Sequence, residues 1–339
     1  MNQEQTYTMS TKASIKTLVI KALSLFSTVR LYNISIIAIA QLLAAVFIIA
    51  PPELSVKEIV LDYKLWLIIL ASAAAIAGGY IINNFYDREK DLINRPQKTM
   101  LENQVSRSTL WTVYFTVNAV AFILGLIVSW RAGLFFAAYI FAMWLYSHKI
   151  KRVLFVGNLT AALLAITPFF VLFMYYRNLY LVVFVHGSFL FLILAMRELI
   201  KDLENLRGDL AQNYHTIPVV LGEKASKRFY TLLTLLTIIP ITALILYFNI
   251  GYMRYYFALI GGALLVCLPL LWSSRRKREY LLIHFILKIV IVGGVLSILL
   301  IDLPALSNDF KISFNEKNTV IYFSFVGRSG LWSGETRFR

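Results

Sequence analysis

The sequence predicts an all-α integral membrane protein, a bundle of about nine transmembrane helices. Hydrophobic residues make up 59% of the 339 positions, whereas a soluble globular domain is about 45–50% apolar. The excess occurs as repeated runs of about 17–24 apolar residues, each long enough to cross a hydrocarbon core of about 30 Å as a helix. Because backbone polar groups in lipid must bond within their own segment, we expect these runs to be helices.

Nine runs of this kind follow one another along the chain. In order they are Ile34–Ala50, Leu65–Ile82, Leu110–Trp130, Ala132–Tyr146, Val153–Tyr176, Leu179–Met196, Tyr230–Ile250, Tyr255–Trp272 and Tyr280–Ile301. The loops at 83–108 and 197–229 are longer and more polar than the others. Both follow an even-numbered span, so we expect an active-site cavity on the face that they share.

The net charge of +15 is distributed unevenly between the two faces. If the N-terminus is cytoplasmic, most of the 33 Lys and Arg lie on the cytoplasmic side. The short loops of the other face carry only Lys57, Lys64, Arg131, Arg177 and Arg254. This positive-inside pattern predicts a cytoplasmic N-terminus and active site, in the cell inner (plasma) membrane. It accounts for the basic charge without a nucleic-acid partner and leaves membrane lipids as the surroundings.

The chain divides into three expected parts. Residues 1–30 mix lysines with apolar residues, as an interfacial amphipathic helix does. Residues 31–302 form the nine-helix membrane domain, and residues 303–339 form a tail of unknown role with a strand-like stretch at 319–325. Since Cys267 is the one cysteine, a disulfide framework and a Cys-based metal site are excluded.

Two polar triplets with the same spacing mark the two long loops. Asn84, Asp87 and Asp91 lie at i, i+3 and i+7, and Asp202, Asn205 and Asp209 repeat that spacing. If the spans continue as helices, each triplet lies on one helix face. Carboxylates at a span end are costly unless they meet water, a partner or a cation. Oxygen ligands of this kind suit Mg²⁺, which binds one or two carboxylates together with substrate phosphates. Solvated loop charges are the simpler alternative, and the pairing of two triplets on one face argues against it.

These motifs resemble those of the UbiA superfamily of intramembrane prenyltransferases. Its members carry N-D-x-x-D-x-x-x-D after the second helix and D-x-x-D-x-x-x-D after the sixth, and this sequence has Asn83-Asn84-x-x-Asp87-x-x-x-Asp91 and Asp202-x-x-Asn205-x-x-x-Asp209. The resemblance covers roughly Arg30 to Ile301. Asn84 and Asn205 stand where the family usually has Asp, so each removes a negative charge while an amide oxygen can still coordinate. We expect activity with weaker or altered Mg²⁺ affinity.

The resemblance implies Mg²⁺-dependent transfer of a polyprenyl group from a prenyl diphosphate, with the isoprenoid tail in an apolar channel. It assigns catalytic roles to Asp87, Asp91, Asp202 and Asp209, and metal coordination to the same four with Asn84 and Asn205. Cations near the motifs are candidates for the diphosphate or a phosphorylated acceptor: Arg30, Arg95, Lys98, Lys151, Arg152, Arg197 and Lys201. His186 and Lys288 lie within spans but belong to neither motif, and we leave them out of the site.

The sequence leaves the acceptor open between two classes. Ile93-Asn94-Arg95-Pro96 follows the first motif, and Arg197-Glu198-Leu199-Ile200-Lys201 precedes the other. Both stretches are most similar to the geranylgeranylglyceryl-phosphate geranylgeranyltransferase branch. An aromatic-acceptor prenyltransferase of quinone biosynthesis is the alternative. A transporter is a third hypothesis, but it predicts polar groups near the middle of matching spans, and here the matched polar groups lie at span ends.

Overall fold

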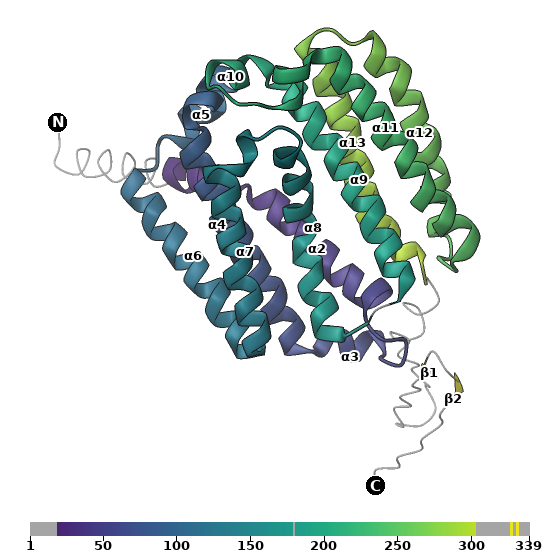
Figure 1. The fold of residues 1–339 in the computed structure, drawn as a ribbon. Helices are drawn as coiled ribbons and strands as arrows, with labels where there is room; N and C mark the ends of the chain where they lie inside the picture. Colours follow the sequence, from purple (N-terminus) through teal and green to yellow (C-terminus); the bar gives the residue numbers. More distant parts are fainter. Residues whose placement is uncertain (1–18, 179, 303–325, 328–329, 332–339) are drawn as a thin grey trace, which may run out of the picture.

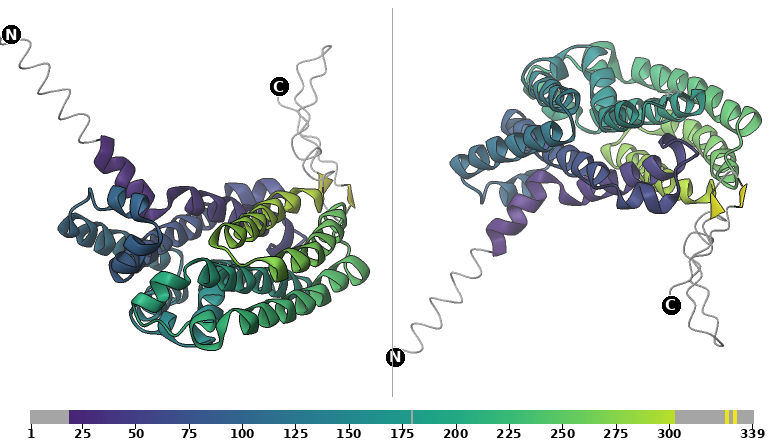
Figure 2. Two further views of the ribbon diagram at one scale, coloured as in Figure 1. Left: turned by 90° about the horizontal axis from the view of Figure 1, so that it is seen from above. Right: turned by 90° about the horizontal axis from the view of Figure 1, so that it is seen from below.

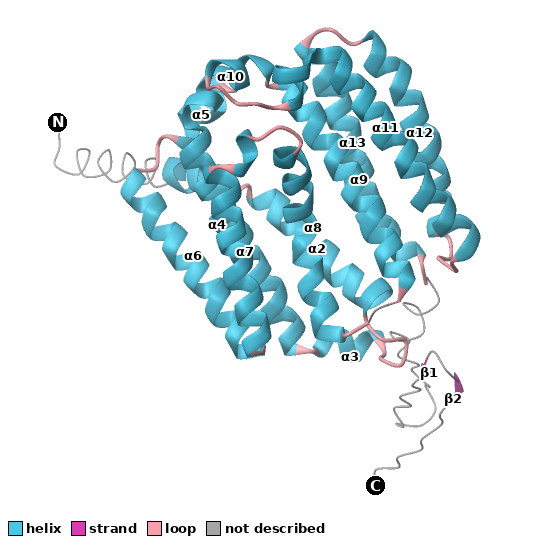
Figure 3. Ribbon diagram, viewed as in Figure 1, coloured by secondary structure: helices cyan, strands magenta, loops and turns pink. Residues whose placement is uncertain are grey.

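A computed structural model shows a bundle of long helices, and it describes residues 19–178, 180–302, 326–327 and 330–331 (Figures 1 and 3). A first apolar helix covers Val19–Val29. The other long helices are α2 (Leu31–Ala44, continued by the π-helix η1, Ala45–Ile49), α4 (Tyr63–Asn94), α6 (Arg107–Val128), α7 (Trp130–His148), α8 (Val156–Tyr176), α9 (Leu181–Glu204), α11 (Ile217–Tyr247), α12 (Met253–Ser273) and α13 (Lys277–Ser297, continued by η3, Ile298–Leu300). The short elements are α3 (Val56–Leu61), α5 (Pro96–Glu102), η2 (Ile150–Arg152), α10 (Leu206–Ala211) and the two-residue strands β1 (Val326–Gly327) and β2 (Gly330–Leu331). The segment 319–325 lies outside the described residues, as does most of the expected interfacial segment.

Eight of these helices are long and apolar enough to cross a membrane. The ninth expected span is α7, which is 19 residues long and packs against α4, α6 and α8. Serine side chains cap the N-termini of two of these helices. Ser106 and Ser129 accept hydrogen bonds from backbone N–H groups in the first turns of α6 and α7. The prediction of an all-α membrane bundle is confirmed, and the chain is an integral membrane protein.

The helices pack in two groups joined by α2 and α8. Helix α4 packs against α6 and α7, and α9 packs against α8, α11 and α13. Figures 1 and 2 agree that α6 lies at one edge of the bundle and α12 at the opposite edge. Large apolar side chains are exposed on the outer helices, for example Leu246, Leu259 and Val266. In water such a surface would be unfavourable, but it suits contact with lipid tails.

Polar groups between the helices are paired with one another. Pro168 cannot donate a hydrogen bond to the carbonyl of Leu164 within α8, and Tyr139 of α7 donates to that carbonyl instead, at 3.1 Å. Gln41 of α2 donates to the Pro168 carbonyl at 2.7 Å and to Ser72 of α4 at 3.0 Å. These contacts give hydrogen-bond donors to two backbone carbonyls around Pro168 within the apolar bundle, and they tie four helices together.

The two long polar segments are mostly helical, which corrects the expectation of loops. Helix α4 runs unbroken to Asn94, so the first triplet lies on one continuous helix as expected. Helix α9 ends at Glu204, and Asn205 has non-helical dihedral angles (φ −101°, ψ 11°) before α10 begins. The second triplet therefore spans a helix break, and its expected stacking on one helix face is wrong. Figure 1 shows α5 and α10 at the same end of the bundle, opposite α3.

Candidate active site

The ends of α4 and α9 meet at this end of the bundle through Asn94. Its amide nitrogen donates to the Asn205 carbonyl at 3.4 Å, and its amide oxygen accepts from the Gly208 N–H at 3.3 Å. A Cβ at position 208 would lie 2.2 Å from the Asn94 amide nitrogen. Only glycine permits this close approach, which sets the position of α10 against α4.

Glu204, the last residue of α9, ties the same region to α13. Its carboxylate accepts a hydrogen bond from Arg95 at 2.9 Å and one from His284 Nδ1 at 2.7 Å. Lys277, at the start of α13, donates to the Asn94 carbonyl at 2.9 Å. Three helix ends that are far apart in the sequence are thus joined by charged hydrogen bonds, which are stronger than neutral ones.

Two lysines neutralise one carboxylate of each triplet. Lys151, in η2, lies 2.7 Å from Asp87, and Tyr214 donates to the same carboxylate oxygen at 2.9 Å. Lys90, between the aspartates of the first triplet, lies 2.5 Å from Asp209 of the second. The ammonium of Lys90 also lies over the Tyr214 ring, 4.4 Å from its centroid. The two triplets therefore belong to one site, since a residue of α4 bonds directly to a residue of α10.

Burial affects the protonation of the site residues that lie outside the spans. It raises the pKa of the Asp209 carboxyl above its usual value, and the neighbouring Lys90 opposes that shift. It lowers the pKa of the Lys151 ammonium, and the neighbouring Asp87 carboxylate opposes that shift. The site thus combines buried opposite charges, which are costly to keep unless each has a partner.

The donor atoms present fit a hard cation such as Mg²⁺. The Asn205 side-chain oxygen is buried and accepts no hydrogen bond from the described part of the chain. The Asn84 amide nitrogen donates to Glu102 at 3.0 Å, which leaves its oxygen as the free ligand atom. The ion pairs seen at this centre involve Asp87 and Asp209 but neither Asp91 nor Asp202. In the described ranges no three His, Cys, Asp or Glu side chains converge tightly enough to form a metal cage by themselves. What supports a cation here is the type of the donor atoms, because Mg²⁺ prefers carboxylate and amide oxygens and takes further ligands from substrate phosphates.

The seven cations singled out from the sequence fall into two groups. Lys151 pairs with Asp87, and the Arg152 guanidinium lies over the Tyr214 ring at 5.0 Å from its centroid. The other five line a separate cavity of about 560 Å³ at the same end of the bundle: Arg30, Arg95, Lys98, Arg197 and Lys201. His284 and Lys288 of α13 line it as well. We call this cavity the basic pocket.

Several residues that build the site were missed by sequence reasoning. Lys90 sits inside the first motif and its spacing from Asp87 was a usable signal, because residues three apart share a helix face. Tyr214 and His284 reach the site only through tertiary folding, from the segment after α10 and from α13. No pattern in the sequence marks either one.

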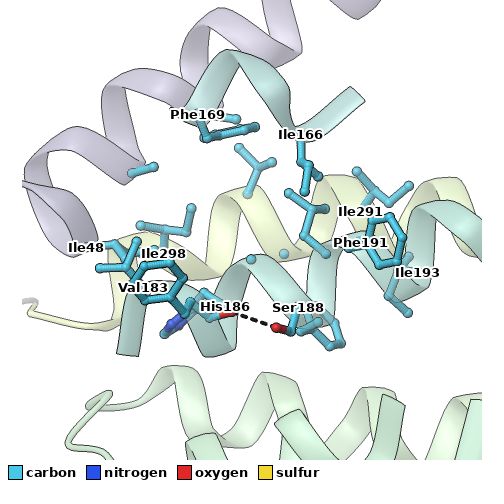
Figure 4. Close-up of a pocket in the computed structure, with 18 of the residues that line it drawn as sticks. Ile48, Ile166, Phe169, Val183, His186, Ser188, Phe191, Ile193, Ile291 and Ile298 are labelled. Carbon is cyan, nitrogen blue, oxygen red and sulfur yellow. Dashed lines mark hydrogen bonds between the residues drawn. The ribbon is translucent and has the colours of Figure 1, made fainter. Parts of the chain in front are cut away.

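A large apolar cavity lies deeper in the bundle (Figure 4). It has a volume of about 470 Å³ and is lined by residues of α2, η1, α8, α9, α12 and α13. Its labelled walls are almost entirely aliphatic or aromatic, for example Ile48, Phe169, Phe191 and Ile291 (Figure 4). The polar exceptions include His186, whose Nδ1 bonds to the Val182 carbonyl of its own helix. Such a cavity suits a hydrocarbon chain.

The helical membrane bundle, the oxygen-rich centre at one end and the apolar cavity below it fit an intramembrane enzyme whose substrate has a polar head and a hydrocarbon chain. The family-level comparison agrees. A model of the UbiA prenyltransferase family matches residues 38–289, most of the chain, so this chain belongs to that family and is a prenyltransferase.

Curated relatives include several archaeal proteins. The chain is 28% identical over 246 residues to digeranylgeranylglyceryl phosphate synthase of Methanosphaera stadtmanae, covering 72% of this chain and 89% of the relative. It is 34% identical over 163 residues to the protein of that name from Thermococcus gammatolerans, covering 47% of this chain and 57% of the relative.

Solved structures share the fold. A structure described as digeranylgeranylglyceryl phosphate synthase in membranes superposes with a TM-score of 0.63 at 21% identity, covering 85% of this chain and 99% of the other. A UbiA homologue from Archaeoglobus fulgidus bound to GPP and Mg²⁺ superposes with a TM-score of 0.62 at 15% identity, covering 81% and 99%. At these identities the likeness supports the fold alone.

Proposed function

We propose that this protein transfers a polyprenyl group from a prenyl diphosphate to the free hydroxyl of a glyceryl phosphate lipid, with geranylgeranylglyceryl phosphate as the preferred acceptor. The observation that carries the proposal is the meeting of the two polar triplets, through Lys90 and Asp209, in one site above an apolar cavity. The names of the relatives from Methanosphaera and Thermococcus support the acceptor. The prenyl diphosphate and Mg²⁺ held by the Archaeoglobus homologue support the donor and the metal.

We assign metal binding to six residues at the meeting point of α4, α9 and α10. They are Asn84, Asp87, Asp91, Asp202, Asn205 and Asp209, and the four aspartates among them are the catalytic set. When bound, Mg²⁺ stabilises the negative charge that develops on the departing diphosphate. Lys151 and Lys90 pair with two of these carboxylates, so with a cation bound there, these two lysines would be available to the negative charge of the diphosphate.

The reaction breaks one carbon–oxygen bond and forms another. The bond between the allylic carbon of the donor and the diphosphate oxygen breaks, that carbon bonds to the acceptor hydroxyl oxygen, and the hydroxyl proton passes to the released diphosphate or to water. Lys151 and Arg152 lie beside the carboxylate centre, where they can hold the charge of the leaving diphosphate. The walls of the apolar cavity exclude water, which would otherwise capture the allylic cation.

The orientation of the protein follows the distribution of its charges. We propose that the end carrying α5, α10 and η2 faces the cytoplasm, in the inner (plasma) membrane, because the Lys- and Arg-rich loops lie there. Residues 31–302 would then be the catalytic membrane domain. In the helix Val19–Val29, Ser24 and Thr28 are buried while Val19, Leu23 and Phe26 are exposed. Polar side chains inside and apolar side chains outside suit a helix whose outer face contacts lipid at the membrane surface.

The direct test is the mass of the lipid product. Purified protein is supplied with Mg²⁺, a labelled prenyl diphosphate and, in parallel, the glyceryl phosphate lipid or an aromatic acid. We expect a product heavier than the glyceryl phosphate by one prenyl group, together with release of diphosphate. A prenylated aromatic acid as the sole product would replace this proposal with the quinone-pathway alternative. Passage of substrate across the membrane without diphosphate release would point to a transporter.

A further inference from the structure

The basic pocket has a charge that the donor site does not account for. Six of its lining residues are cations: Arg30, Arg95, Lys98, Arg197, Lys201 and Lys288. Three carboxylates outside the lining pair with some of them. Glu204 pairs with Arg95, Glu102 with Lys98, and Glu198 with both Arg197 and Lys201. Arg30 and Lys288 form no ion pair or hydrogen bond through their side chains with the described residues.

Lys288 is the least expected of these cations. It lies within the span of α13, where an unpaired ammonium is costly unless it serves a ligand or a water-filled path. It is one turn beyond His284, which bonds to Glu204 at the rim of the same pocket. An anionic partner would stabilise a cation in this position, and no carboxylate of the described chain forms an ion pair with it.

Arg30 is held at the pocket by an unusual backbone conformation. It joins the helix Val19–Val29 to α2 with a left-handed backbone (φ 52°, ψ 52°), which a non-glycine residue adopts rarely. Its guanidinium lies over the Tyr80 ring of α4 at 4.9 Å from the centroid. Such strain persists where the surrounding structure fixes it, and functional sites are common places for it.

The basic pocket and the apolar cavity follow the same three helices. On α2 the basic pocket reaches Ser35 and the apolar cavity begins at Ala40. On α9 the two are bounded by Arg197 and Ile193. On α13 they are bounded by Lys288 and Val290, about 3 Å apart along the helix axis at 1.5 Å per residue, although residues two apart project from different sides of a helix. The basic pocket therefore lies at the level of the bundle where the apolar interior begins, which suits the anionic head of a lipid.

The size of the charge favours a phosphomonoester. Six cations and three paired carboxylates leave an excess of positive charge, and Asp91 lies within electrostatic range of Arg30 and Arg95 from the neighbouring centre. Among the residues that the structure describes, two positive charges therefore stay uncompensated. A phosphomonoester carries about −1.5 to −2 at neutral pH, which matches that excess, whereas an aromatic carboxylate carries only one negative charge.

We infer that the basic pocket binds the phosphate of the acceptor lipid, with Lys288 and Arg30 as its specificity-determining residues, separately from the metal centre that takes the donor diphosphate. The inference rests on the proposed function, because it assigns the headgroup of that same acceptor. It revises the grouping of the cations: Lys151 and Arg152 serve the donor, and the five that line the basic pocket serve the acceptor. The basic pocket needs no metal to bind a phosphate, because the side chains that line it are themselves cations.

The test compares Lys288→Met with Lys288→Arg and with Arg278→Met as a matched control. Arg278 is an exposed cation of the same helix, at the same end of the bundle, outside the pocket. Loss of one hydrogen bond to a charged group weakens binding by about tenfold or more, so we expect Lys288→Met to raise the acceptor KM by about that factor. The donor KM and the kcat at saturating acceptor stay unchanged. Lys288→Arg restores most of the affinity, Arg278→Met behaves as wild type, and Arg30→Gln repeats the effect of Lys288→Met.

A binding measurement without turnover supplies an independent readout. In EDTA, wild-type protein should bind the glyceryl phosphate lipid about tenfold more tightly than Lys288→Met does, and the two proteins should bind the dephosphorylated lipid equally weakly. A rise in the donor KM with an unchanged acceptor KM would overturn the inference, and so would equal binding of phosphorylated and dephosphorylated lipid by wild type. The proposed function fails separately, if wild-type protein prenylates an aromatic acid and not the glyceryl phosphate.

Discussion

Glu204 offers the sharpest test of how the site is assembled. Its side chain is 2% exposed and accepts charged hydrogen bonds from Arg95 at 2.9 Å and His284 at 2.7 Å. Glu204→Gln keeps the size of the side chain but removes its charge. Its amide oxygen can still accept from Arg95, and its NH₂ can donate to Nδ1 in the other tautomer of His284, so both hydrogen bonds persist without the carboxylate charge.

The magnitude follows from those two contacts. Hydrogen bonds to charged groups contribute about 1.5–3 kcal/mol each and neutral ones about 0.5–1.5 kcal/mol, so weakening both should cost about 2–3 kcal/mol. Each kcal/mol lowers the Tm of a domain of this size by about 2 °C, which predicts a fall of about 4–6 °C. Turnover should fall as well, because the contacts that hold Asp202 and Asp209 in register with α4 are weakened.

The assay is thermal unfolding in detergent, with turnover measured on the same samples. Glu58→Gln is the control, since Glu58 caps α3 at the opposite end of the bundle and is exposed. Glutamine serves in a capping box as glutamate does, so its effect should stay below about 1 kcal/mol. Equal Tm values for the two variants would refute the view that Glu204 joins the helix ends.

Three other features of the site and bundle give further predictions. Gly208→Ala places a Cβ against the Asn94 amide, so it should destabilise the protein by about 1–3 kcal/mol and lower kcat by displacing α10. Unfolding and turnover assays measure these two effects, and wild-type values in both would contradict the prediction. Tyr139→Phe removes the hydroxyl that donates to the Leu164 carbonyl, so it should lower the free energy of unfolding in detergent by about 1–3 kcal/mol with little change in KM. An unchanged Tm would show that this hydrogen bond does not stabilise the bundle. Removal of divalent metal with EDTA should abolish turnover and excess Mg²⁺ should restore it; persistent turnover in EDTA would exclude a metal-dependent reaction.

The fold was predictable because its signal is local. Each apolar run identifies its own span, and the alternation of basic and neutral loops identifies which ends share a face. The break at Asn205 was not visible in the spacing, and it lies beside the contact of Gly208 with Asn94 on a different helix. Spacing in the sequence indicates which residues share a helix face only while the helix continues.

The site was predictable in part for the same reason. Asp87 and Asp91 are four residues apart, as residues on one helix face are, and the second triplet has the same spacing as the first, which pointed to a shared cavity. The lysine partners of the carboxylates, the hub at Glu204 and the role inferred for Lys288 depend on residues brought together from α4, α9 and α13. No sequence motif surrounds Lys288, and its role can be inferred only from the cations that lie beside it in the folded protein.

The most direct test of the central claim is the loss of turnover when the two helix ends lose one carboxylate each. Mg²⁺-dependent diphosphate release is measured for Asp87→Asn and Asp202→Asn, with Glu53→Gln, an exposed acid between η1 and α3 at the other end of the bundle, as the control. Removing one electrostatic contact to a developing charge typically costs about 100- to 1,000-fold in rate, so both aspartate variants should lose at least about 100-fold in kcat while the control keeps wild-type turnover. Wild-type rates in either aspartate variant would contradict a single centre built from α4 and α9.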